Sequence, residues 1–260
     1  MGNLIKADFY RMRKSKVFIA CNIIAFALSF LWPLAEMALL NFAQSVSKEP
    51  VAPPDTHFQF AKMLAQPVGG LILVVLLLSV LSFSFADVAH GYIKNIAGHV
   101  KKKSYTVVSK FIVIMIHNII VMLVSVLGVY FGNLVRMVMC GGSIDYLANL
   151  GTGFGIFGFK WLLFMSLSTI TLFFSTALRS KTSAAIVSVM FGTGALSMFY
   201  MLIQNFLHFD LSDFMPDSLS STLNFTTINA LAINIVASSV IVIAVFLIVS
   251  MKIVDKRDVK

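Results

Sequence analysis

Hydrophobic residues in this chain fall into six long runs, and most polar residues lie in the segments between them. No Lys, Arg, Asp or Glu occurs in residues 17–35, 68–86, 111–135, 161–178, 182–207 and 230–251. A helix crosses the hydrocarbon core of a bilayer with about 20 apolar residues. The pattern therefore predicts an all-α integral membrane protein with six transmembrane helices. We expect them near residues 17–40, 68–86, 107–131, 161–178, 182–207 and 230–251.

The segments between the runs are too short to form a separate soluble domain. The longest, near 41–67 and 132–160, each have under 30 residues, whereas a domain needs at least about 50. The composition agrees, because 12% of residues are charged against about 25% in soluble proteins. Residues 1–260 are therefore predicted to form a single transmembrane domain.

The basic residues show which side each segment occupies. Segments 1–16, 87–110, 179–181 and 252–260 hold 16 of the 20 Lys and Arg residues. Basic residues near span ends stay in the cytoplasm, so both termini are predicted to be cytoplasmic. The net charge of +9 is then explained by anionic membrane lipids or a cytosolic partner, and not by nucleic acid.

Two cytoplasmic segments are amphipathic. Residues 1–16 place Ile5, Phe9 and Met12 on one helical face, which predicts a helix lying in the membrane interface. A basic flank that merely orients the first span is the alternative. The residues expected to characterise this interfacial helix are Phe9, Tyr10, Arg11, Arg13 and Lys14.

A second amphipathic helix is predicted over 87–100, with Asp87 as its N-cap. Ala89, Tyr92, Ile93 and Ile96 recur at helical spacing. Such a helix needs an apolar partner, which is either the headgroup region or a docked protein.

No catalytic or metal-binding arrangement is found. His117 has no acidic residue within helical reach, so we expect it to bond to another helix. Glu36, near the outer end of the first span, either reaches outer water or contacts a passing substrate or partner. Hydroxyl groups on the fourth span serve either helix packing or a substrate path, for which the candidates are Ser168, Thr171 and Ser175, together with Glu36. The glycines of 151–158 do not form a phosphate-binding loop and indicate a bent or re-entrant entry to the fourth span.

Three short motifs resemble the ABC-2 type permease subunits of ATP-binding cassette exporters. They are L-I-K-x-D-F-Y-R…K-S-K over 4–16, D…G-x-I-K-N…G…Y…S-K over 87–110, and K-R-D at 256–258. The stretch His99 to Lys103 departs from the family, where Ser-Arg is more frequent, which leaves the docking geometry open. Small permeases of Gram-positive bacteria for bacteriocin immunity and peptide export are the most similar kind.

The resemblance implies a non-catalytic subunit of the bacterial cell membrane that exports or expels an amphipathic peptide, antibiotic or lipid-like molecule. It implies a separate cytosolic ATPase carrying ATP and Mg²⁺, a second permease copy, and no cofactor on this chain. It also makes 87–100 a coupling helix whose ATPase contacts are Asp87, His90, Gly91, Tyr92, Ile93, Lys94, Asn95 and Ile96. An ion-coupled carrier and a non-transporting scaffold or sensor remain alternatives.

Overall fold

The structure is a computed structural model that describes residues 1–46, 57–66, 70–89, 102–178, 180–207 and 211–256. The long helices are α2 (Lys16–Val46), α4 (Gly70–Ala89), α6 (Tyr105–Cys140), α7 (Leu150–Ala177) and α11 (Ile228–Lys256). The short ones are α1 (Gly2–Lys14), α3 (Phe60–Ala65), α8 (Lys181–Thr193), α9 (Ser197–Leu207), the 3-10 turn η1 (Leu211–Phe214) and α10 (Pro216–Thr222). The expected all-α class is confirmed.

One small sheet was not predicted. Strands β1 (His57–Gln59) and β2 (Ser143–Asp145) pair in parallel, with His57 opposite Ser143. The strands precede α3 and follow α6, so the sheet ties two connecting segments together at one end of the helices. Three residues in each strand are too few for hydrophobic periodicity to show in the sequence.

Among the described residues, four helices are long and apolar enough to cross a membrane: α2, α6, α7 and α11. The apolar part of α4, Gly70–Ala86, is shorter. The helix that contains the third predicted span, 107–131, is longer than that span, because α6 continues to Cys140. Arg136, expected in an outer loop, therefore lies inside a helix.

The fifth predicted span, 182–207, is not one helix. Gly194 adopts φ +70°, and α8 ends there. The amide of Ala195 bonds to the Met190 carbonyl at 3.1 Å, and that of Gly194 bonds to the Phe191 carbonyl at 3.4 Å. This pair of bonds is a Schellman motif, which closes a helix where glycine takes a left-handed conformation. At 13 residues, α8 is about 20 Å long and does not by itself cross a hydrocarbon core of about 30 Å.

The glycine-rich entry to the fourth span is also regular, contrary to expectation. α7 is one continuous helix from Leu150, so no helix break occurs at these glycines. A Cβ on Gly153 would lie 2.8 Å from the Ala61 backbone. This glycine therefore lets α3 pack directly against α7, which accounts for part of the glycine content.

α2 and α6 approach each other through two glycines spaced four residues apart. A Cβ on Gly128 would lie 2.6 Å from the Phe26 carbonyl oxygen, and one on Gly132 would overlap the Phe30 carbonyl oxygen. Small residues at this spacing let two membrane helices pack backbone to backbone. Leu76, Leu77, Met122, Phe164 and Leu167 form the main core between α4, α6 and α7.

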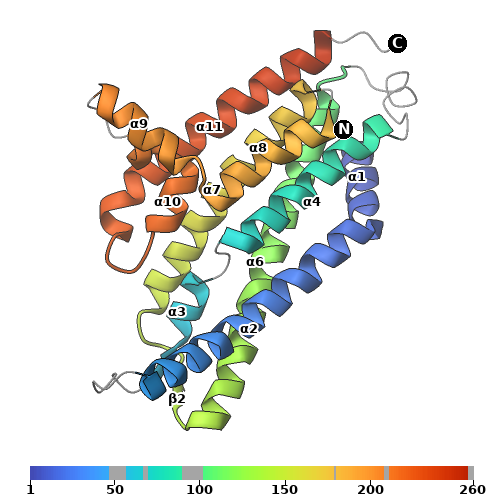
Figure 1. Ribbon diagram of the computed structural model, residues 1–260. Helices are drawn as coiled ribbons and strands as arrows, with labels where there is room; N and C mark the ends of the chain where they lie inside the picture. The colour runs from blue at the N-terminus through green and yellow to red at the C-terminus, as the bar shows by residue number, and fades with distance from the viewer. Residues whose placement is uncertain (47–56, 67–69, 90–101, 179, 208–210, 257–260) are drawn as a thin grey trace.

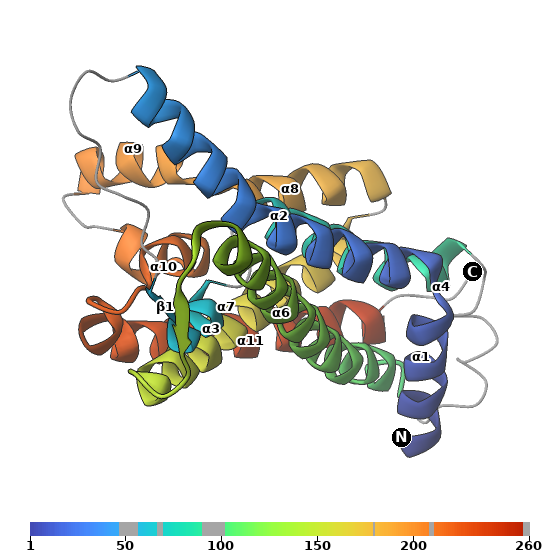
Figure 2. The ribbon, with the colours of Figure 1, turned by 90° about the horizontal axis from the view of Figure 1, so that it is seen from below.

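α2 and α6 run away from the end where α1 lies, and α4, α7 and α11 run toward it, which places α1 and the C-terminal end of α11 at the same end of the bundle (Figure 1). α1 leaves the direction of α2 at Ser15, whose ψ of 126° ends the helix (Figure 2). This end is called the basic end below. Its basic residues include Arg13, Lys14, Lys102, Lys252 and Lys256. The other end, with the sheet, α3 and α10, is called the sheet end.

Candidate functional site

At the basic end, α1 is fastened to α6 through a buried carboxylate. Asp8 is 2% exposed. Its Oδ2 accepts a hydrogen bond from Ser109 Oγ at 2.5 Å, and its Oδ1 lies 2.9 Å from Arg11 Nη1. Charge-assisted bonds of this kind are about twice as strong as neutral ones. The contact fixes the N-terminal helix against the first turns of α6.

Two further bonds bring α4 and α11 to the same place. Lys110 Nζ donates to the Ser84 carbonyl oxygen at 2.9 Å, near the C-terminal end of α4. The backbone amide of Ser104, just before α6, donates to Asp255 Oδ1 of α11 at 2.8 Å. These three contacts, which Ser104, Ser109 and Lys110 make along the first turns of α6 with Asp255, Asp8 and Ser84, are together called the hub. Four helices meet in it, and two of them, α4 and α6, lead into residues 90–101.

The predicted coupling helix lies mostly outside the described residues. Asp87 lies in the last turn of α4, which continues to Ala89, so it does not cap a helix starting there. The other proposed contacts, His90 to Ile96, fall in the segment 90–101 that the structure does not describe. The role of these residues stays a prediction.

The predicted interfacial segment does form a helix, α1. Within the protein, Asp8 and Met12 are buried and Phe9 is 37% exposed. Burial of the Asp8 carboxylate is explained by its hydrogen bond from Ser109, because a buried carboxylate needs a partner. The position of α1 in the membrane interface stays a prediction. Tyr10, Arg13 and Lys14 are exposed.

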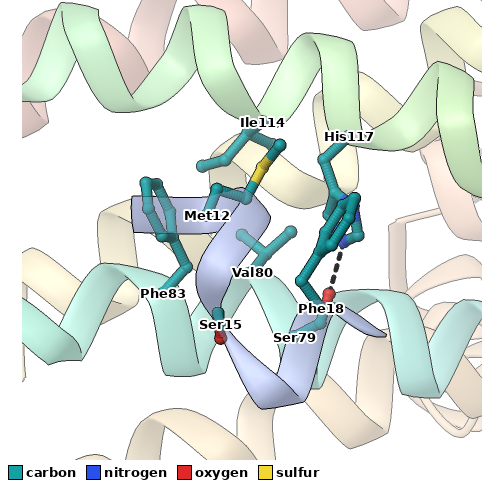
Figure 3. A pocket seen from close by; sticks show the side chains of 8 residues that line it. All are labelled: Met12, Ser15, Phe18, Ser79, Val80, Phe83, Ile114 and His117. Carbon is teal, nitrogen blue, oxygen red and sulfur yellow. Dashed lines mark hydrogen bonds between the residues drawn. The ribbon is translucent and has the colours of Figure 1, made fainter. Parts of the chain in front are cut away.

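Beside the hub, a cavity of about 10 Å³ lies where α1 turns into α2 (Figure 3). His117 of α6 and Phe18 of α2 meet there, with ring centroids 4.9 Å apart. His117 Nε2 lies 2.6 Å from Ser79 Oγ of α4, while Ser79 donates to the Leu76 carbonyl oxygen at 2.8 Å. His117 Nε2 is the donor in this pair when the Ser79 hydroxyl donates to the Leu76 carbonyl oxygen, and the tautomer of His117 decides between the two arrangements. The expected bond of His117 to another helix is confirmed.

The second ring nitrogen of His117, Nδ1, has no hydrogen-bond partner among the described residues. Within the part of the chain that the structure describes, no three His, Cys, Asp or Glu residues are placed to hold a metal ion. The cavity of about 10 Å³ beside His117 has room for about one water molecule.

The residues proposed for a substrate path are not brought together. Ser168, Thr171 and Ser175 are buried on one face of α7. Ser168 Oγ accepts from Asn118 Nδ2 of α6 at 3.0 Å, and Thr171 Oγ1 accepts from Ser188 of α8 at 3.4 Å. These contacts are helix packing, and the cavities described in this section have other linings.

Glu36 makes an ion pair at the sheet end. Its Oε2 lies 3.1 Å from Arg136 Nη1, and Arg136 also stacks over the Phe58 ring at 5.1 Å. Arg136 lies 18 residues beyond Asn118, about 27 Å along α6. The ion pair therefore lies far from the α7 hydroxyls. The sequence analysis did not find this partner, since it placed Arg136 in a loop.

A larger cavity of about 670 Å³ opens near the sheet end, among α2, α3, α4, α6 and α7. Leu28, Trp32, Leu71 and Val129 are among its apolar lining residues, and Lys62 and Lys160 line it too. A second cavity of about 510 Å³ shares Gln66, Gly70 and Lys160 with the first. The pair is called the sheet-end cavity below.

A buried carboxylate that accepts hydrogen bonds from within the protein lines the second part of the sheet-end cavity. Asp217 of α10 is 5% exposed, and the Tyr200 hydroxyl of α9 donates to its two oxygens at 3.0 and 3.2 Å. Burial raises the pKa of Asp217 above its ordinary value of 3.8. This bond holds α9 against α10 after the break at Gly194.

Features that were not predicted from the sequence include the hub carboxylate Asp8, the ion pair of Arg136 and the close approach at Gly128 and Gly132. The last had a readable signal, G-x-x-x-G inside an apolar run. Comparison with protein-family models, curated proteins and solved structures found no match to this chain.

Proposed function

We propose that this chain is the membrane-spanning permease subunit of an ATP-driven exporter in a bacterial cell membrane. It moves an amphipathic molecule, and ATP is hydrolysed with Mg²⁺ on a separate cytosolic chain. Four spanning helices and the family-like motifs at 4–16 and 87–110 support this proposal. A second copy of the permease completes the assembly.

The observation that carries the proposal is the hub. The segment 90–101 leaves α4 and re-enters before α6, and both helices are fixed in the hub by Lys110 and by the amide of Ser104. A partner that pushes on this segment therefore acts on α4 and α6 directly. Through Asp8 and Asp255 it acts on α1 and α11 as well.

Through the hub, few contacts separate the proposed ATPase-binding segment from the helices that must change conformation. A partner shifts a conformation only by the difference between its binding free energies to the two states. Rigid helices joined by charge-assisted bonds transmit such a shift without losing it in loops. The basic end then faces the cytoplasm, because basic residues near spans stay on that side.

The distribution of buried acids favours this proposal over an ion-coupled carrier. Among the described residues, the buried carboxylates are Asp8 and Asp217, and neither lies in a candidate span. Glu36 lies in α2 but is half exposed and paired. Proton-coupled carriers use acidic groups buried at membrane depth.

Purification of the chain from its native membranes in mild detergent tests the proposal. We expect a nucleotide-binding chain to co-purify in a fixed ratio, and ATP hydrolysis to co-elute with it. Tyr92→Asp, which places a charge in the proposed apolar contact, should remove both. Tyr146→Asp is the control, because Tyr146 is exposed at the sheet end. Undiminished association of the Tyr92→Asp protein would contradict the coupling role.

A further inference from the structure

We propose that the sheet-end cavity binds a single-chain amphiphile with an anionic headgroup. The headgroup lies at Lys160 and Lys62, and the apolar chain lies along Trp32, Leu71 and their apolar neighbours. As an assignment of the cargo class, this inference rests on the proposed function. As a binding site, it does not depend on the ATPase.

The cavity has the size and lining of a ligand site. Pockets for small molecules measure about 300–1,000 Å³ and are mostly apolar with a few placed polar groups. The larger part, at about 670 Å³, falls in this range. Leu28, Trp32, Leu71, Ile72 and Val129 form its apolar wall. Its size suits one apolar chain.

The depth of Lys160 requires an explanation. It lies 10 residues inside α7, about 15 Å along the helix from Leu150. Its ammonium group donates to the Ala65 carbonyl oxygen at 2.6 Å. An ammonium group has three donors, and this bond uses one. α7 is one of the candidate spans, and a cation at membrane depth in such a helix is costly and characteristically marks a ligand or ion pathway.

The charge around Lys160 is not balanced by the described part of the chain. No ion pair of Lys160 occurs there, and none of the described residues lining the larger part is acidic. Asp217 lines the second part, but its carboxylate is engaged by Tyr200. Lys62 adds a second positive charge to the larger part.

These observations select the occupant. An anionic head supplies the missing acceptors for Lys160, while a cationic head is repelled by two lysines. A neutral amphiphile fills the apolar wall but leaves the ammonium donors unpaired, which costs free energy in an apolar setting. The asymmetric lining therefore favours an apolar chain with one negative end.

Trp32 provides the readout, because bromine atoms quench tryptophan fluorescence at contact. The chain has two tryptophans, so Trp161→Phe leaves Trp32 as the reporter. The detergent-solubilised Trp161→Phe protein is titrated with 9,10-dibromostearate and with its uncharged methyl ester. We expect the carboxylate to quench at about tenfold lower concentration than the ester. A hydrogen bond from the ammonium group to a charged acceptor is stronger than one to a neutral acceptor, and the difference corresponds to about tenfold in affinity.

Charge removal then localises the headgroup. Lys160→Gln should weaken dibromostearate binding about tenfold without changing the response to the ester. Lys62→Gln, at an exposed position where folding is not at risk, should weaken it in the same direction. Lys252→Gln, exposed on α11 at the basic end, is the matched control and should have no effect.

Equal quenching by the ester and the carboxylate would overturn the proposal, as would unchanged binding after both cavity substitutions. Dibrominated phosphatidylglycerol in nanodiscs is the last arm. Quenching by this lipid as strong as that by dibromostearate would overturn the single-chain assignment in favour of a membrane phospholipid. The titrations contain no ATPase, so their failure leaves the co-purification result standing and is distinguishable from failure of the proposed function.

Discussion

Ser109 donates a 2.5 Å hydrogen bond to the buried carboxylate of Asp8, across 101 residues of sequence. This bond joins the N-terminal helix to the start of α6. It belongs to the hub, whose contacts join α1, the C-terminal part of α4, the first turns of α6 and the last turn of α11. The proposed mechanism depends on this joint being stiff.

The strength of the joint can be measured by a double-mutant cycle. Asp8→Asn and Ser109→Ala should each lower the free energy of unfolding. The two losses should be coupled by about 1 kcal/mol or more, because a charged hydrogen bond is removed by either change. Chemical denaturation in mild detergent gives the four stabilities. Additive losses would mean that the two side chains do not interact in the folded protein.

Close packing of α2 on α6 is tested by adding one methyl group. Gly128→Ala places a Cβ 2.6 Å from the Phe26 carbonyl oxygen, so we expect a loss of about 1–3 kcal/mol of stability. Gly158→Ala is the matched control in helix α7, where nothing lies within 4 Å of the new Cβ. It should be neutral or stabilising by up to about 1 kcal/mol, because alanine favours helix.

The native cysteines report the orientation in the membrane. Cys140 is exposed at the sheet end, and Cys21 is buried. A membrane-impermeant maleimide should therefore label Cys140 on intact cells. In a Cys140→Ser background, Lys102→Cys at the basic end should react only after permeabilisation. Labelling in the opposite order would invert the orientation.

The raised pKa of Asp217 predicts a pH dependence of stability. The folded protein holds this proton more strongly than the unfolded chain. The stabilising contribution is therefore complete below the ordinary pKa of 3.8 and is lost as pH rises through the folded pKa. Tyr200 bonds this carboxylate, and Lys160 lines the same cavity.

Melting temperatures measured from about pH 4 to about pH 8 test this dependence. The native protein should lose more stability over this range than Asp217→Asn, which cannot ionise at this position. Asp213→Asn, at an exposed position in η1, should behave like the native protein. Identical pH profiles for all three proteins would show that burial does not perturb Asp217.

Hydrophobic runs were sufficient to predict the helical class and the approximate place of the four spanning helices. They did not predict helix ends, because charge-free runs stop at Arg136 while the helix does not. The guanidinium group is tolerated there through Glu36 and Phe58, which are remote in sequence. The helix break at Gly194 was not predicted, because the apolar residues around it continue the hydrophobic run. The left-handed conformation of the glycine does not change that hydrophobic pattern.

Site residues were harder to predict than helices for the same reason. No role was predicted for Asp8 from the sequence, and only its contact with Ser109 shows why it is buried. Lys160 was expected at the end of a loop, just before the predicted span 161–178, but α7 begins 10 residues earlier. Both assignments depend on contacts between segments that local periodicity does not encode.

Motion at the sheet end on ATP binding at the basic end is the central claim, and a label on Cys140 measures it directly. The complex of this chain with its ATPase is labelled with an environment-sensitive dye and reconstituted in liposomes. We expect ATP with Mg²⁺ to change the fluorescence, and Tyr92→Asp to abolish the change. A response of the chain alone to a proton or sodium gradient, with none to ATP in the complex, would contradict the account.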